Sequence, residues 1–129
     1  MSINYRKEPD MSNAAFGLII TFTAKAGQQA ALVAHLSQAG ASYANEPGTE
    51  QFVVATSPTQ PDAVIVIERY SSHAAHATHE AAAGYAEIRA KTGQFLAGPP
   101  QVLPLMIAGG KLMAAAWVSA CKWVMACNF

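Results

Sequence analysis

Apolar side chains recur at two-residue or helical spacing along most of the chain, and these patterns predict its secondary structure. Residues 16–23 form a β-branched and aromatic run of strand length. Residues 28–45 carry apolar side chains at helical spacing, at Leu32, Leu36, Ala39 and Tyr43. Glu46-Pro47-Gly48 ends this helix, because the residue before a proline is pushed out of the α region.

The second half of the chain predicts a hairpin, a broken helix and a final strand. Extended runs cover residues 51–56, 63–70 and 101–107. Turn-forming residues separate the first two, so we expect an antiparallel hairpin. Ser71 or Ser72 caps the next helix, Gly84 breaks or kinks it, and it continues to Phe95. Pro104 places the last strand at an edge or a bulge.

The predicted order of elements is βαββαβ, the α+β, ferredoxin-like arrangement with an antiparallel sheet. Helices in this topology cover one face of the sheet only. Residues 18–20 and 64–67 are nevertheless apolar at consecutive positions, so both faces of their strands favour burial. A second copy of the chain is the economical cover, and we therefore expect a homodimer.

Composition fits one globular domain. The 129 residues are 52% hydrophobic and 12% charged, which suffices for a compact core. Eight basic and eight acidic side chains cancel, and no Lys/Arg cluster exists, so a nucleic-acid partner is excluded. The first residues lack the apolar run of a secretory signal, so cytoplasmic residence is expected.

The two ends depart from the pattern of the central domain, residues 15–108. Residues 1–14 are polar and predict a flexible arm. Residues 109–129 form an apolar tail whose charge-free span, between Lys111 and Lys122, is shorter than the roughly 20 residues of a bilayer crossing. The tail is interpreted as a docking helix or as vector-encoded sequence. No membrane partner is expected.

Candidate chemistry gathers where the third predicted strand meets the following helix. Side chains alternate along a strand, so Glu68 and Tyr70 share one face while Ile67 and Arg69 share the other. A carboxyl group and a phenol on one face can hold a polar ligand. Alternatively, Glu68 pairs with an arginine or caps the helix, and Tyr70 is packing.

The helix that follows carries three histidines. At 3.6 residues per turn His73, His76 and Glu80 share a face, whereas His79 turns toward the strand that ends at Tyr70. Two histidines and a carboxylate can bind a divalent metal, but the alanine neighbours offer no supporting hydrogen bonds, so no metal is expected. For His79, the alternatives are chemistry and helix-to-strand packing.

Other side chains are candidates for binding a substrate. Aromatic residues on several elements can line a pocket or simply fill the core, namely Tyr43, Phe52, Tyr85 and Phe95. Arg89 can receive an anionic oxygen or pair with Glu87 on the surface. The chain carries no P-loop, GxGxxG, GxSxG or HExxH motif, so nucleotide, hydrolase and zinc-protease functions lack support.

These motifs resemble the antibiotic biosynthesis monooxygenase family of the dimeric α+β barrel superfamily, over roughly residues 16–108. Lys25 and Gly27 are similar to the family's turn after the first strand, and Glu46-Pro47-Gly48 to its helix terminator. The family's Glu, aromatic residue, Ala and His match Glu68, Tyr70, Ala74 and His79, and Tyr85 matches an aromatic that follows. Gly84 stands where many members carry a second His.

The resemblance implies a monooxygenase that oxidises a phenolic or hydroquinone-type aromatic to a quinone with O2, without metal, flavin or haem. His79 would act as general base or hydrogen-bond partner, while Tyr70 and Glu68 orient the substrate oxygen. Phe52, Tyr85, Arg89 and Phe95 would contact the substrate. Haem-degrading relatives place Trp and His where this chain has His79 and Arg89, so haem is not expected.

Two other functions remain open from the sequence. A non-catalytic dimeric barrel would bind a small apolar metabolite, because one fold serves many functions. An isomerase or decarboxylase on the same scaffold is the second alternative. Oxygen consumption that depends on His79 separates the monooxygenase from both.

Overall fold

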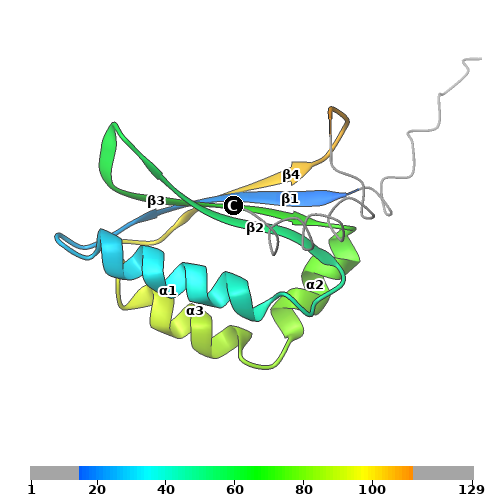
Figure 1. Ribbon diagram of the computed structural model, residues 1–129, viewed down its shortest axis with the longest axis horizontal. Coiled ribbons are helices and arrows are strands. Elements are labelled where there is room, and N and C mark those ends of the chain that lie inside the picture. The colour runs from blue at the N-terminus through cyan, green and yellow to red at the C-terminus, as the bar shows by residue number, and fades with distance from the viewer. Residues whose placement is uncertain (1–14, 112–129) are drawn as a thin grey trace, which may run out of the picture.

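The chain folds into one sheet covered by helices (Figure 1). The computed structural model describes residues 15–111. Its elements are, in order, β1 (Phe16–Thr23), α1 (Gln29–Ser42), β2 (Thr49–Ser57), β3 (Gln60–Tyr70), α2 (His73–Ala81), α3 (Tyr85–Gly93) and β4 (Gln101–Met106). The predictions for the arm, residues 1–14, and for residues 112–129 of the tail lie outside the described residues.

The sheet has the strand order β2-β3-β1-β4, and every neighbouring pair is antiparallel. The helices all lie on one face of it, as Figure 1 shows. The predicted ferredoxin-like α+β fold is therefore confirmed. Pro104 pairs on one side only, opposite Leu18, because β4 is an edge strand.

The strands of the hairpin are longer than predicted, and the first helix is shorter. The turn between β2 and β3 contains only Pro58 and Thr59, because Ser57 already pairs with Gln60. Residues 61–63 fall in a register irregularity on β3, which accommodates a proline without a backbone donor. α1 ends at Ser42, and turns carry the chain from there to β2.

The main core lies between α1 and the inner face of β1 and β3. Leu32 and Val64 are fully buried, and Phe22, Leu36 and Val66 pack around them. The strand residues alternate in sequence and the helix residues are four apart, so each element buries one side. A smaller cluster of Phe16, Leu18 and Tyr70 closes the end of the sheet near α2.

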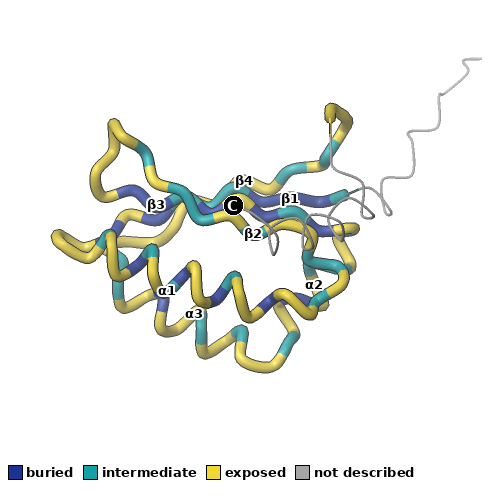
Figure 2. The backbone as a smooth tube through the Cα atoms, in the orientation of Figure 1, coloured by how far each residue is buried: buried dark blue, intermediate teal, exposed yellow. Residues whose placement is uncertain are grey.

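The helix-free face of the sheet is apolar and open. Val53, Ile67 and Leu103 rank among the exposed large hydrophobic side chains, and the strand register brings Val53 opposite Ile67. Figure 2 shows exposed and half-buried positions along the strands. Among the described helices, none has the length and apolar character needed to cross a membrane.

The second helical segment is broken as predicted. Ser72 caps α2 by accepting a hydrogen bond from the Ala75 backbone at 3.1 Å. Gly84 has φ of 88°, a left-handed conformation that turns the chain from α2 into α3. α3 packs mainly on α1 and α2, and the chain then returns to β1, where the Ala97 N–H donates to the Thr23 carbonyl.

Replacing Gly84 with alanine tests this break. The added Cβ meets no atom within 4 Å, so the left-handed backbone alone is responsible for the expected loss of about 1–2 kcal/mol in the free energy of unfolding. Gly93→Ala is the matched control, because its Cβ also meets nothing and its backbone is helical. Urea denaturation of both variants measures the difference. Equal effects would contradict the assignment.

Candidate active site

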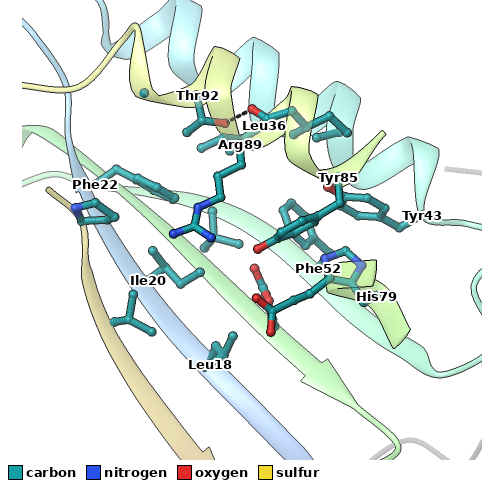
Figure 3. Close-up of a pocket in the computed structure, with 18 of the residues that line it drawn as sticks. Leu18, Ile20, Phe22, Leu36, Tyr43, Phe52, His79, Tyr85, Arg89 and Thr92 are labelled. Atoms are coloured by element: carbon teal, nitrogen blue, oxygen red, sulfur yellow. Dashed lines mark hydrogen bonds between the residues drawn. The ribbon is translucent and has the colours of Figure 1, made fainter. Parts of the chain in front are cut away.

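A cavity of about 390 Å³ lies between α3 and the inner face of the sheet, within the size range of small-molecule sites. Its sheet wall consists of apolar side chains that alternate along the strands, namely Leu18, Ile20, Phe22 and Val66. α1 contributes Leu36 and Ala39, and α3 contributes Tyr85, Ile88, Arg89 and Thr92. The polar groups gather toward the end where α2 lies, as Figure 3 shows for His79 and Tyr85.

His79 occupies the last turn of α2 and is 3% exposed. Its Nδ1 lies 2.7 Å from Glu46 Oε1, and the same carboxylate oxygen accepts a 2.8 Å hydrogen bond from Thr49 Oγ1. Because a carboxylate only accepts, Nδ1 carries the proton and donates it. The ring also borders the cavity, where it contacts Tyr43 and Tyr85 edge-on. His79 therefore borders the cavity, while its hydrogen bond to Glu46 fixes the ring on the side away from the cavity.

Glu68 and Tyr70 share the inner face of β3, as the strand period predicts. Tyr70 is fully buried and donates a 2.6 Å hydrogen bond to Glu68 Oε2. Burial raises the pKa of Glu68 above its ordinary value, although the Tyr70 hydrogen bond and nearby His79 act in the opposite direction. Glu68 lines the cavity, but Tyr70 does not. The Tyr70 hydroxyl is therefore placed to orient Glu68, while its role toward a substrate stays a prediction.

Three aromatic rings predicted to line a pocket do so. Tyr43 packs edge-on against Phe52, with ring centroids 5.2 Å apart, and Tyr85 stands on the α3 side. Gly40 makes room for Phe52, because a Cβ there would lie 2.7 Å from the ring. Burial raises the pKa of Tyr43 to about 12, and burial also raises the pKa of Tyr85. Both phenols therefore stay protonated beside His79.

Arg89 lies at the cavity, whereas Phe95 lies outside it. Arg89 lines the cavity, and its guanidinium extends from α3 toward the sheet (Figure 3). No ion pair with Glu87 is present among residues 15–111. Phe95 does not line the cavity, and its role in substrate binding stays a prediction. It stacks on His35, whose Nε2 lies 2.8 Å from Thr92 Oγ1, because the chain beyond α3 turns back toward β1 there.

Two more histidines lie on α2, and of these only His73 lies outside the cavity, whereas the helical period predicted that His76 and Glu80 would also face away from His79. His76 lies 3.3 Å from Glu80, and His73 packs edge-on against Phe16. Burial lowers the pKa of His76, and Glu80 partly opposes this shift. Both His76 and Glu80 border the cavity. In the part of the chain that the structure describes, no three histidine, cysteine or acidic side chains converge as a metal site would require.

A second cavity of about 360 Å³ lies behind His79. Its lining includes Glu46, Thr49 and the segment between them, together with Ala75, Thr78 and Ala82 from the α2 side. The imidazole ring of His79 borders both cavities. Glu46 borders only the second, where its side chain is 26% exposed.

Glu46 is the partner of His79 that sequence reasoning missed. Its only visible signal was the Glu46-Pro47-Gly48 terminator of the first helix, which explains a change of chain direction. The same turn brings the carboxylate to the last turn of α2, 33 residues further along the chain. The available clue was that a buried imidazole requires a polar partner, which the carboxylate of this helix terminator could supply.

The fold and the site define a small α+β protein with a partly polar cavity between its sheet and helices. The sequence profile of the antibiotic biosynthesis monooxygenase family matches residues 15–91, and the chain belongs to this family. No curated protein matches the sequence significantly.

Solved structures share this fold. A candidate antibiotic biosynthesis monooxygenase from Chloroflexus aurantiacus is 28% identical, with a TM-score of 0.67, and the match covers 78% of this chain and 100% of that chain. A protein from Mycobacterium tuberculosis is 24% identical, with a TM-score of 0.68, covering 75% and 98%. A protein of unknown function from Nitrosomonas europaea is 24% identical, with a TM-score of 0.69, covering 81% and 99%.

Replacing Glu68 with glutamine tests the burial of this carboxyl group. Because the pKa of Glu68 is raised in the folded state, its contribution to stability is fully present below its ordinary pKa. That contribution is lost as pH rises through the raised value. Glutamine still accepts the Tyr70 hydrogen bond but cannot ionise. When the pH is raised from about 4 to about 8, Glu68→Gln should therefore gain stability relative to wild type.

Urea denaturation of both proteins across this pH range measures the gain. Glu87→Gln is the control, because Glu87 is exposed on α3. A stability difference between Glu68→Gln and wild type that does not change with pH would contradict the predicted pKa shift.

Proposed function

We propose that the protein is a cofactor-independent monooxygenase that oxidises a phenolic or hydroquinone-type aromatic to a quinone with O2. The family and the fold support the class of protein, and one observation at the site supports the type of reaction. A buried imidazole, His79, borders an aromatic-lined cavity of about 390 Å³ and is held by a carboxylate on its far side. Such an arrangement suits removal of a proton from a phenol.

The chemistry needs only deprotonation, orientation and exclusion of water. Triplet O2 reacts poorly with closed-shell molecules, but a phenolate can transfer one electron to it. The resulting superoxide and phenoxyl radical combine at the ring carbon opposite the oxygen to form a peroxide. Cleavage of its O–O bond with loss of the hydrogen on that carbon releases water. One phenol that carries a hydrogen on that carbon and one O2 thus give one quinone and one H2O, whereas one hydroquinone and one O2 give one quinone and one H2O2.

Different residues of the cavity would deprotonate and orient the substrate. His79 Nε2 accepts the hydroxyl proton, and its place in the last turn of α2 favours a positive charge. Glu68, whose raised pKa favours its protonated form, donates a hydrogen bond to the substrate oxygen. The protonated phenols of Tyr43 and Tyr85 do not compete with the substrate for oxidation as phenolates.

A second copy of the chain is the proposed cover of the helix-free face. Val53, Ile67 and Leu103 are exposed there, and burying such side chains contributes about 1.5–3 kcal/mol each. On the same face Arg69 pairs with Glu50 at 3.0 Å, yet its Nε is buried without a hydrogen-bond partner in the described residues. An acceptor from a second sheet would satisfy this donor.

Replacing His79 with alanine tests the reaction. We expect quinone formation to fall by about 10²- to 10⁴-fold, the usual contribution of a general base. A panel of anthrones, phenols and hydroquinones, incubated in air and without oxygen, supplies the readout as quinone absorbance and O2 consumption. His73→Ala is the matched control, because His73 lies on the same helix outside the cavity. Binding without turnover would favour a metabolite-binding barrel, and oxygen-independent conversion an isomerase or decarboxylase.

Replacing Ile67 with glutamate tests the dimer. A charge in the centre of an apolar interface is costly, so the variant should sediment as a single protomer while wild type sediments as a dimer. Ala77→Glu places the same charge on an exposed position of α2 and should remain dimeric. A monomeric wild type would refute the proposed interface.

A further inference from the structure

The two ring nitrogens of His79 meet different surroundings. Nδ1 lies against Glu46, on the side of the second cavity. Nε2 makes no hydrogen bond within residues 15–111, and it is not among the buried atoms that lack a partner. Because His79 also lines the first cavity, we assign Nε2 to that open space. The ring is therefore asymmetric, with one nitrogen occupied and one free.

This asymmetry decides which tautomer the neutral ring adopts. A hydrogen bond from one ring nitrogen to an acceptor keeps the proton on that nitrogen and leaves the other nitrogen of the neutral ring without a proton. A free histidine side chain in water favours the proton on Nε2, and in that form no lone pair would face the first cavity. The Glu46 carboxylate accepts from Nδ1–H and so reverses this preference.

Thr49 holds the carboxylate in place. Its hydroxyl donates to the same oxygen that faces His79, at 2.8 Å. Gly48 lets α2 approach this turn, because a Cβ there would lie 2.7 Å from the Ala75 Cβ. The turn after α1 and the last turn of α2 are thereby fixed relative to each other. Glu46 stays outside the first cavity and does not meet a ligand bound there.

We propose that Glu46 is a positioning residue that keeps the proton of His79 on Nδ1, leaves Nε2 free to accept a substrate proton, and stabilises the imidazolium that results. The inference rests on the proposed role of His79 as proton acceptor. In this step the O–H bond of the substrate breaks, its proton forms a bond to Nε2, and the electron pair stays on oxygen. The carboxylate of Glu46 keeps its charge throughout and balances that of the ring.

The tautomer is measured directly by two-bond ¹H–¹⁵N correlation spectra of protein with labelled histidine. The spectra are recorded at a pH where the ring is neutral, and the signals are assigned by their loss in His79→Ala. Wild type should show the proton on Nδ1 of His79. Glu46→Ala should shift it to Nε2, and Glu46→Gln should retain it on Nδ1, because the amide oxygen still accepts. Glu87→Gln, a change on the exposed side of α3, should match wild type.

Kinetics separate the geometric contribution from that of the charge. Glu46→Gln, which keeps the hydrogen bond and loses the charge, should lower kcat by about 10-fold, and Glu46→Ala, which loses both, by about 100-fold, a part of what the base contributes, with KM little changed. A wild-type proton on Nε2, or an unchanged tautomer in Glu46→Ala, would overturn the inference. An unchanged kcat in both variants would do so as well. If Glu46→Ala does not fold, the wild-type spectrum and Glu46→Gln still decide.

The tautomer measurement does not depend on the proposed reaction, so the two proposals can fail separately. A protein that shows the Nδ1–H tautomer but oxidises no phenol would refute the monooxygenase and support the arrangement of His79 and Glu46. A protein that forms quinones with the proton on Nε2 would support the monooxygenase and refute the role of Glu46.

Discussion

One-sided coverage of a four-stranded sheet is the constraint on which the rest of this structure depends. The face of the sheet that the helices cover contributes to both the hydrophobic core and the cavity, and these lie at different places along it. α1 seals one part with Leu32 and Leu36, while α3 packs on the neighbouring helices and leaves space above β1. The left-handed turn at Gly84 makes this possible, because a continuous helix could not change direction there.

Two buried ionisable groups of the site each have a hydrogen-bond partner. Tyr70 satisfies Glu68, and Glu46 satisfies His79. Left alone, either buried group would cost several kcal/mol. The two acids also have different surroundings. Burial raises the pKa of Glu68, whereas Glu46 keeps contact with water through the second cavity.

Local periodicity predicted most of the fold and part of the site. Alternation along β3 placed Glu68 and Tyr70 on one face, and the helical period turned His79 away from His73 and toward the strand. The pairing of Glu46 with His79 could not be predicted, since it depends on how two distant turns pack. The position of Phe95, which stacks on His35 outside the cavity, could not be predicted for the same reason. The β-bridge between Ala24 and Leu96 draws the segment that contains Phe95 toward the core. No local sequence pattern encodes that pairing.

The contact between Gly40 and Phe52 has a consequence for the choice of ligand. The ring fits only because α1 lacks a side chain at that point. A methyl group there would push the ring inward and shrink the space beside Tyr43, whereas a smaller residue at position 52 would enlarge it. Under the proposed function, a substitution at Gly40 or Phe52 would therefore change which aromatic ring systems the cavity holds, without altering any ionisable group.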